Sequence, residues 1–406
     1  MDSAAIADNN TDQPPREIEQ CENCARTIGR LEHPHLWEQH VVCSNCWRTL
    51  SSETTEQTLR KGRLAALIAR SNENAPQASP DHAETSVFQA DLPDYADQLT
   101  LAQHHERAAA GDPTSMNRIA ILYSQGKGVG QDTVKAMAWF QRSAAAGSSA
   151  AMRNIGAFYA AGKGVPRDTS KAFTWFQRAA AAGDATAMAA LGYLYEEGRG
   201  IEADIQQATQ WYERAAVLGD ITAMYALGRI FERGHGVPKD IAGAVGWYTR
   251  AAEAGCRVAM SSLGVLYATG HGVLQNDAMA FEWFDKAAEA GHGYAMFELG
   301  RFYETGRGVD LNFNLALLWY QKAAAHGHVG AMGAIGRLYA MGRGTTQDYL
   351  QALAWLIKAA EMGDLAAMHD VAYFYENGLG VSRNQKEALK WHRMAIDVET
   401  TQPGQA

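Results

Sequence analysis

One spacing dominates this 406-residue chain: a tryptophan recurs every 36 residues, eight times, without insertion or deletion. A methionine series from Met116 to Met368 and an alanine three positions before each tryptophan keep the same period. Self-similarity at such a period is typical of a solenoid, in which each unit buries its apolar face by stacking on its neighbours. We therefore expect eight stacked repeats over residues 112–399, with their methionines and tryptophans in the core. The tryptophans are Trp139, Trp175, Trp211, Trp247, Trp283, Trp319, Trp355 and Trp391.

Each repeat contains the signals of two helices. In the second repeat, Met152, Ile155 and Tyr159 form one apolar stripe at helical spacing. Gly162 and Gly164 follow, and glycine readily ends a helix and turns the chain. An Asp or Asn stands seven positions before every tryptophan, which fits an N-cap that accepts a free backbone N–H. These caps are Asp132, Asp168, Asp204, Asp240, Asn276, Asn312, Asp348 and Asn384. The repeat is therefore a predicted αα-hairpin.

A glycine also recurs inside the predicted first helix, where it costs about 0.5–1 kcal/mol relative to alanine. Its recurrence indicates that a neighbouring helix passes too closely for even a methyl group. These glycines are Gly156, Gly192, Gly228, Gly264, Gly300 and Gly336, with Ala120 and Ala372 in the two outer repeats.

The pattern that runs from Ala187 through Gly219 resembles the Sel1-like repeat, a relative of the tetratricopeptide repeat. The resemblance implies an all-α, right-handed superhelix of helix pairs that serves as an adaptor or scaffold for other proteins. It provides no general catalytic residues. Some secreted members carry a disulfide in each repeat, and the repeats of this chain contain only Cys256. Together with the absence of a signal-like N-terminus or an apolar span, this favours a cytoplasmic protein.

The other four cysteines form two C-x-x-C pairs separated by 18 residues, Cys21 with Cys24 and Cys43 with Cys46. This spacing predicts a tetrahedral Zn²⁺ site, and four sulfur ligands make the site structural. Two disulfides are the alternative, which a reducing compartment disfavours. The intervening His33, His35 and His40 are interpreted as loop residues. The pairs resemble a zinc-ribbon or LIM-like module, a type that binds proteins or nucleic acids.

We expect the chain to be organised around these two features. The predicted order is a disordered tail (1–20), the zinc module (21–50), a short helix (51–70), a flexible linker (71–91), an N-terminal capping helix (92–111), the eight repeats (112–399) and a tail (400–406). The first 111 residues carry 9 Lys+Arg against 17 Asp+Glu, and the remainder carries 27 against 28. Without a strong basic field, binding to a phosphate backbone is not favoured.

No catalytic motif is recognisable, so we predict a protein that is not an enzyme. Cys256, His292 and His328 share one repeat position, with His326 nearby. Equivalent positions in stacked helices lie about 8–10 Å apart, whereas zinc needs its ligands at about 2.0–2.3 Å. These residues are therefore interpreted as surface residues at helix N-termini, with no metal.

A binding surface can be predicted by subtracting the packing positions. Two variable positions remain, one and five residues after each methionine, and they share one helix face. Tyr and Arg are frequent at interface hot spots. We predict a partner-binding groove formed by Tyr193, Tyr225, Arg229, Phe297, Arg301, Arg337, His369 and Tyr373. The alternative is that some of these side chains are half-buried against the adjacent helix.

The sequence thus predicts a non-enzymatic scaffold. Its solenoid would bind a protein or peptide in a concave groove, and its structural zinc module would be an accessory interaction site. The alternative is a regulator whose zinc module contacts nucleic acid. A hydrolytic activity is a third possibility, for which no nucleophile with a nearby base is found.

Overall fold

The computed structural model describes residues 35–37, 40–42 and 99–401. The two short segments are strands β1 (His35–Trp37) and β2 (His40–Val42), which pair antiparallel with His35 opposite Val42. They lie in the sequence between the two cysteine pairs. His35 and His40 therefore belong to strands, which corrects their interpretation as loop residues. All four cysteines lie outside the described residues, as do the predicted tail, the predicted short helix, the predicted linker and most of the predicted zinc module.

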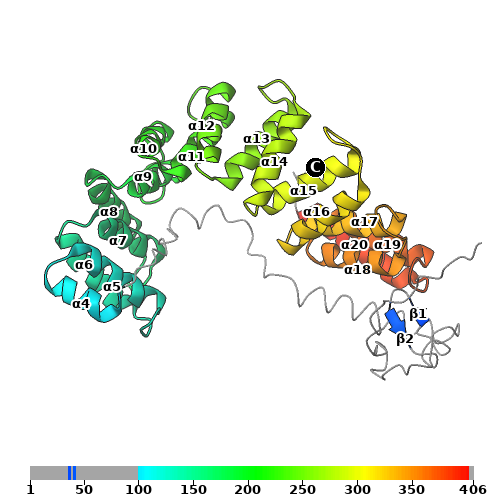
Figure 1. The fold of residues 1–406 in the computed structure, drawn as a ribbon, viewed down its shortest axis with the longest axis horizontal. Helices are drawn as coiled ribbons and strands as arrows, with labels where there is room; N and C mark the ends of the chain where they lie inside the picture. Colours follow the sequence, from blue (N-terminus) through cyan, green and yellow to red (C-terminus); the bar gives the residue numbers. More distant parts are fainter. Residues whose placement is uncertain (1–34, 38–39, 43–98, 402–406) are drawn as a thin grey trace, which may run out of the picture. The chain divides into compact units, whose positions relative to one another are not determined.

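From Leu101 onward, the described chain consists of α-helices joined by short turns (Figure 1). A single helix, α4 (Leu101–Ala109), precedes eight helix pairs. The first helices of the pairs are α5 (Pro113–Gln125), α7 (Ser149–Ala161), α9 (Ala185–Glu197), α11 (Ile221–Arg233), α13 (Arg257–Thr269), α15 (Gly293–Thr305), α17 (Val329–Met341) and α19 (Leu365–Asn377). The second helices are α6 (Thr133–Ala145), α8 (Thr169–Ala181), α10 (Ile205–Val217), α12 (Ile241–Glu253), α14 (Asp277–Glu289), α16 (Phe313–Ala325), α18 (Tyr349–Glu361) and α20 (Gln385–Thr401). The prediction of eight αα-hairpins is confirmed.

The helices belong to two compact units whose boundary lies within α17, between Ala331 and Met332. We call residues 99–331 the N-terminal unit and residues 332–401 the C-terminal unit. In the N-terminal unit, each pair follows the previous one in chain order, from α4 to α16 (Figure 1). None of the helices in the described part of the chain is long and apolar enough to cross a membrane.

The predicted caps form in every repeat. The Asp132 carboxylate accepts the Lys135 backbone N–H at 2.9 Å, and its counterparts make the same bond as far as Asn384, which accepts the Glu387 N–H at 3.2 Å. The second helices of the first seven repeats are each followed by a glycine at positive φ. At Gly147, φ is +93°, and the 3.0 Å bond from its N–H to the Ala144 carbonyl belongs to a Schellman motif.

The tryptophans are less buried than the prediction of a core position requires. Seven of the eight are only half-buried, and Trp391 alone is fully buried, at 6 % exposure. In the first seven repeats the next residue takes the central place in the core, as Phe140, Phe176, Tyr248 and Phe284 do at 0–1 % exposure. The reason is visible in the contacts of the indoles. In seven repeats the Arg or Lys three residues later lies over the indole, at 3.9–5.4 Å from the ring centre. Five of these indoles also pack against core clusters.

Five of the six recurring glycines inside the first helices face that same buried ring, and Gly336 faces the side chain of Leu356. A Cβ added to Gly228 would lie 2.5 Å from the ring of Tyr248, and one added to Gly264 would lie 2.7 Å from the ring of Phe284. The inference that no methyl group fits is therefore confirmed. The close neighbour is an aromatic side chain of the second helix rather than its backbone.

Candidate partner-binding face

The candidate site lies on one side of the first helices. We define the first-helix face as the residues one, five and eight positions after the methionine of each first helix. Such positions are neighbours on a helix surface. In α11 they are Tyr225, Arg229 and Glu232. The prediction included the first two positions and missed the third.

The predicted residues of α11 are half-buried and contact other residues of the array. The ring of Tyr225 lies 5.6 Å from that of Tyr248. Burial raises the pKa of the Tyr225 hydroxyl, although Arg229 and a hydrogen bond with Ser262 oppose the shift. The Arg229 guanidinium pairs with the carboxylate of Glu196, which lies on α9, the first helix of the preceding repeat. Thirty per cent of the Arg229 side chain remains exposed. The face is therefore ordered by ion pairs between repeats while keeping part of its aromatic and cationic surface accessible.

The predicted residues of α15 belong to an aromatic cluster. Phe297 stacks on His328, with ring centres 4.3 Å apart and planes 20° apart, and Tyr294 lies 6.0 Å from the same imidazole. Arg301 is more than half exposed and pairs with Glu298 at 3.1 Å. Phe297 and Arg301 thus present one aromatic and one cationic surface within a single helix turn.

Tyr193 corrects the prediction. Its side chain is only 6 % exposed and belongs to a buried cluster with Ala189, Tyr212 and Ala226. The two alanines leave room for the phenol ring inside the stack, so Tyr193 packs between repeats and offers little surface to a partner. The alternative of burial against an adjacent helix applies fully to this residue.

The remaining predicted residues lie in the C-terminal unit. Arg337 contacts the carboxylate of Asp370 at 3.4 Å, and burial raises the pKa of Asp370 although Arg337 opposes this shift. His369 is exposed, 3.9 Å from the carboxylate of Glu399. Tyr373 is the most open of the set, at 56 % exposure.

The third position of the face provides a contact that sequence reasoning missed. In four repeats it is a glutamate that accepts a hydrogen bond from the second helix of the same repeat, and we call this contact the clasp. The clasps join Tyr212 to Glu196 at 2.9 Å, Tyr248 to Glu232 at 2.6 Å, Tyr320 to Glu304 at 2.5 Å and His392 to Glu376 at 3.1 Å.

The other four repeats lack both partners of the clasp. Where the second helix has Phe or Leu, the residue 16 positions earlier is Ser or Ala, as in the pairs Phe140 with Ser124, Phe176 with Ala160, Phe284 with Ala268 and Leu356 with Ala340. A buried phenol needs an acceptor and a buried phenyl does not, so the two positions change together. This matched alternation is readable in the sequence, by comparing repeat positions 16 residues apart.

The position shared by Cys256, His292 and His328 is the N-cap of the first helices. Elsewhere Asp or Ser accepts a backbone N–H there, as Asp184 does from Ala187 at 2.8 Å. Cys256 and His292 make no such side-chain bond, and His328 Nδ1 accepts the Ala331 N–H at 3.2 Å. The interpretation as helix N-terminal residues is confirmed. Within the described part of the chain, no three His, Cys, Asp or Glu side chains are grouped to hold a metal ion.

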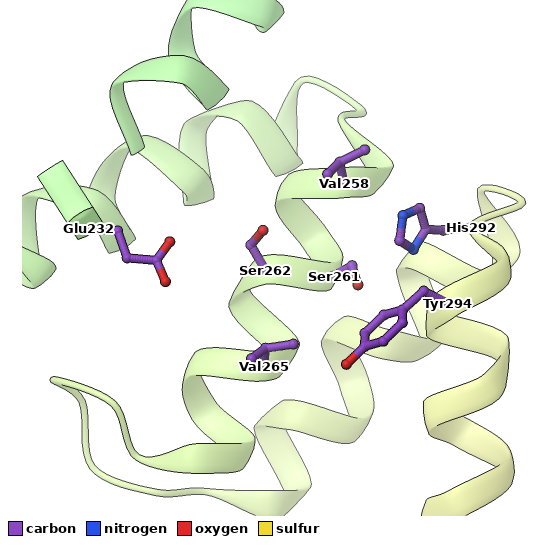
Figure 2. A pocket seen from close by; sticks show the side chains of 7 residues that line it. All are labelled: Glu232, Val258, Ser261, Ser262, Val265, His292 and Tyr294. Carbon is purple, nitrogen blue, oxygen red and sulfur yellow. The ribbon is translucent and has the colours of Figure 1, made fainter. Parts of the chain in front are cut away.

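A pocket of about 200 Å³ opens on the first-helix face between α11, α13 and α15 (Figure 2). The carboxylate of Glu232 and the phenol of Tyr294 lie on opposite sides of it. Burial, and secondarily Glu298, raise the pKa of Tyr294 to about 12, so its hydroxyl stays protonated at neutral pH. The pocket is lined by Glu232, Val258, Ser261, Ser262, Val265, His292 and Tyr294. It combines a carboxylate, three hydroxyls and an aromatic wall, which suits binding of a polar group.

Comparison with known proteins agrees with this architecture. The Sel1 repeat model matches residues 113–148, 149–184, 185–220, 221–256, 257–292, 293–328, 329–364 and 365–397. No curated protein sequence matches.

Two solved structures are similar over much of the chain. One is a protective antigen with a Sel1-like repeat fold present in uropathogenic Escherichia coli strains, with 30 % identity over 74 % of this chain and a TM-score of 0.67. The chain spans 64 % of that antigen's length. The other is a Sel1 repeat protein from Oxalobacter formigenes, with 33 % identity, a TM-score of 0.52, and coverage of 59 % of this chain and 93 % of that one. The eight matched repeats show that this chain belongs to the Sel1 repeat family.

Proposed function

We propose that this protein is a non-enzymatic scaffold that binds a protein or peptide on the first-helix face of its N-terminal unit. The observation that carries the proposal is the surface left accessible there. Tyr225 and Phe297 are half-buried, Arg229 and Arg301 keep 30 % and 54 % of their side chains exposed, and a pocket opens between α11 and α15. Partly exposed Tyr and Arg around a pocket are the residue types that carry most of the energy of protein interfaces. Sel1 repeats generally mediate protein interactions, which supports the same assignment.

The test replaces Tyr225, Arg229, Phe297 and Arg301 together by alanine in the full chain. We expect this variant to lose the partner that the unmodified chain retains in affinity purification with mass spectrometry. Its helical circular dichroism should stay close to that of the unmodified protein. The matched control carries four alanines at exposed positions of second helices and should keep the partner: Gln177, Gln210, Glu282 and Gln321. Retention of the partner by the first variant, or its loss from both, would refute the assignment to this face.

We further propose that Cys21, Cys24, Cys43 and Cys46 hold a structural Zn²⁺ and that this module is an accessory interaction site. Support comes from the C-x-x-C spacing, which suits a closed tetrahedral thiolate site. The same thiolates favour a cytoplasmic location, where they stay reduced. Metal analysis of the purified full chain should give one zinc per chain, which Cys21→Ser with Cys24→Ser abolishes. Four cysteines found as disulfides by alkylation and mass spectrometry would overturn this proposal.

A further inference from the structure

Glu232 is a carboxylate that lacks the cation found at its counterpart in the preceding repeat. Glu196 of α9 pairs with Arg229, five positions after the methionine of the next first helix. The residue that stands in that relation to Glu232 is Val265 of α13. Among the described residues, Glu232 accepts a hydrogen bond from the Tyr248 hydroxyl and has no ion pair within 4 Å. The repeat thus keeps the anion and its clasp but omits the arginine.

The omitted arginine leaves a space, and that space is part of the pocket. Glu232 and Val265 both line it, and Figure 2 shows the carboxylate directed toward the helix that carries Ser262 and Val265. The position one residue after the methionine also contributes, because it is Ser261 here and Tyr225 or Phe297 in the two adjacent repeats. A small residue between two aromatic ones makes the face hollow at this point.

The charges around the pocket favour a cation. The nearby arginines are already paired, Arg229 with Glu196 and Arg301 with Glu298. Glu232 is therefore the uncompensated charge that lines the space. The hydroxyls of Ser261, Ser262 and Tyr294 add hydrogen-bond acceptors, and the phenol ring adds a surface on which a cation can stack. An arginine side chain matches this set because its planar guanidinium presents five N–H donors.

The N-cap position points the same way. His292 lines the pocket where most first helices carry an Asp or Ser that caps the helix with its side chain. Losing such a cap costs about 0.5–2 kcal/mol. Residues that break a local stability rule are expected at functional sites. The break at His292 coincides with the missing arginine and with the hollow beside it.

We propose that the pocket between α11, α13 and α15 binds one arginine side chain of a basic peptide segment of the partner, with Glu232 as its counter-ion. This inference rests on the proposed function, because it names the chemistry recognised at the same face. The partner's guanidinium occupies the place that Arg229 takes beside Glu196 one repeat earlier. An intermolecular ion pair thereby corresponds to the intramolecular pair between Glu196 and Arg229.

The test uses the full chain with isotope-labelled valine methyl groups, because Val258 and Val265 line the pocket. The probe is a blocked pentapeptide, Gly-Ala-Arg-Ala-Gly, titrated to about 10 mM, a range suited to the weak affinity of a single side chain. We expect saturable shifts of both valine signals. The control peptide carries citrulline in place of arginine, which keeps the shape and removes the charge, and should bind at least about tenfold more weakly.

Two variants check the role of the carboxylate. Glu232→Gln keeps an acceptor for the Tyr248 hydroxyl but removes the charge, so the affinity for the arginine peptide should fall at least about tenfold. Val265→Arg supplies an internal guanidinium, as Arg229 does, and should abolish binding of the peptide. Valine signals that do not shift, or that shift equally with both peptides, would overturn the proposal.

Retention of the partner by two variants distinguishes this inference from the proposed function. Both stand if Val265→Arg and the fourfold alanine variant of the first-helix face each release it. If only the fourfold variant releases it, the face binds the partner but the arginine pocket does not. If neither does, both proposals fail.

Discussion

Removing the hydroxyl of Tyr320 isolates the energy of one clasp. This hydroxyl donates to the Glu304 carboxylate at 2.5 Å, while the ring is 1 % exposed and lies against Gly300. Tyr320→Phe keeps the buried ring, so no cavity opens. A hydrogen bond to a charged group contributes about 1.5–3 kcal/mol net. Because Glu304 is half-buried and partly solvated, we expect a loss of about 1–2 kcal/mol in the free energy of unfolding.

Glu304→Ala is the second single variant of a double-mutant cycle. It leaves the buried phenol without this acceptor, which costs about 1–3 kcal/mol. The double variant Tyr320→Phe with Glu304→Ala recreates the pair that native repeats use as Phe176 with Ala160. Replacing both partners is nearly neutral in such cases. We therefore expect the double variant to lose less than the sum of the single variants, with a coupling energy of about 1–2 kcal/mol.

Urea unfolding followed by far-ultraviolet circular dichroism measures all four proteins of the cycle. Stability in a repeat array is approximately a sum of repeat and nearest-neighbour contributions, so midpoints of variants in the same repeat are comparable. The converse experiment installs a clasp where the protein has none. Phe284→Tyr alone should destabilise, and adding Ala268→Glu should restore stability. Single effects that add within about 0.3–0.5 kcal/mol would refute the coupling that the alternation implies.

Four further substitutions test other features of the repeats. Gly228→Ala should destabilise by about 1–3 kcal/mol, because the added Cβ would lie 2.5 Å from a buried aromatic ring that the clasp holds in place. Gly246→Ala, on an exposed part of α12 with nothing within 4 Å, should stabilise by about 0.5–1 kcal/mol, and thermal melts compare the two. Cys256→Asp restores a missing N-cap and should stabilise by about 0.5–2 kcal/mol in urea, and an unchanged midpoint would contradict the cap assignment. Arg307 lowers the pKa of Asp277 below its ordinary 3.8, so the stability from this pair is present above that pH and is lost as the pH falls through the lowered folded value. The stability difference between the protein and Asp277→Asn should therefore shrink as the pH falls through the lowered folded pKa. A difference that grows as the pH falls would contradict a stabilising pair.

The helix pairs could be predicted because every repeat carries the same local signals. A cap such as Asp132 or a terminating glycine such as Gly162 acts on its own helix, and its physical effect is set within a few residues of sequence. Because these signals recur from repeat to repeat, they can be distinguished from a chance occurrence. For the same reason the sequence identified the surface positions of the first helices, including Tyr225 and Arg301.

Properties set by contacts between helices were predicted less well. The tryptophans are only half-buried, and cations such as Arg142 lie over their rings. This arrangement depends on the geometry of the stack. Tyr193 turns inward because alanines of its own and the following repeat leave room for it. The clasps were not predicted, although their two positions change together. Each partner alone resembles an ordinary surface glutamate or core aromatic residue. The four cysteines stay a prediction, because they lie outside the described residues.

The N-cap position of the first helices departs from its usual residues in three adjacent repeats. Three consecutive first helices begin at Cys256, His292 and His328 instead of an acidic or hydroxyl cap. Cys256 and His292 make no side-chain cap bond and forgo about 0.5–2 kcal/mol each, whereas His328 still accepts the Ala331 N–H. In a one-dimensional array that deficit is shared only with adjacent repeats. The preceding first helices keep their caps, so they can hold the array together beside a weaker segment. His328 instead stacks on Phe297, and His292 lines the pocket next to Glu232. Stability is thus given up in the repeats that build the proposed arginine site, and an aspartate in place of His292 should add about 0.5–2 kcal/mol to the stability of the fold.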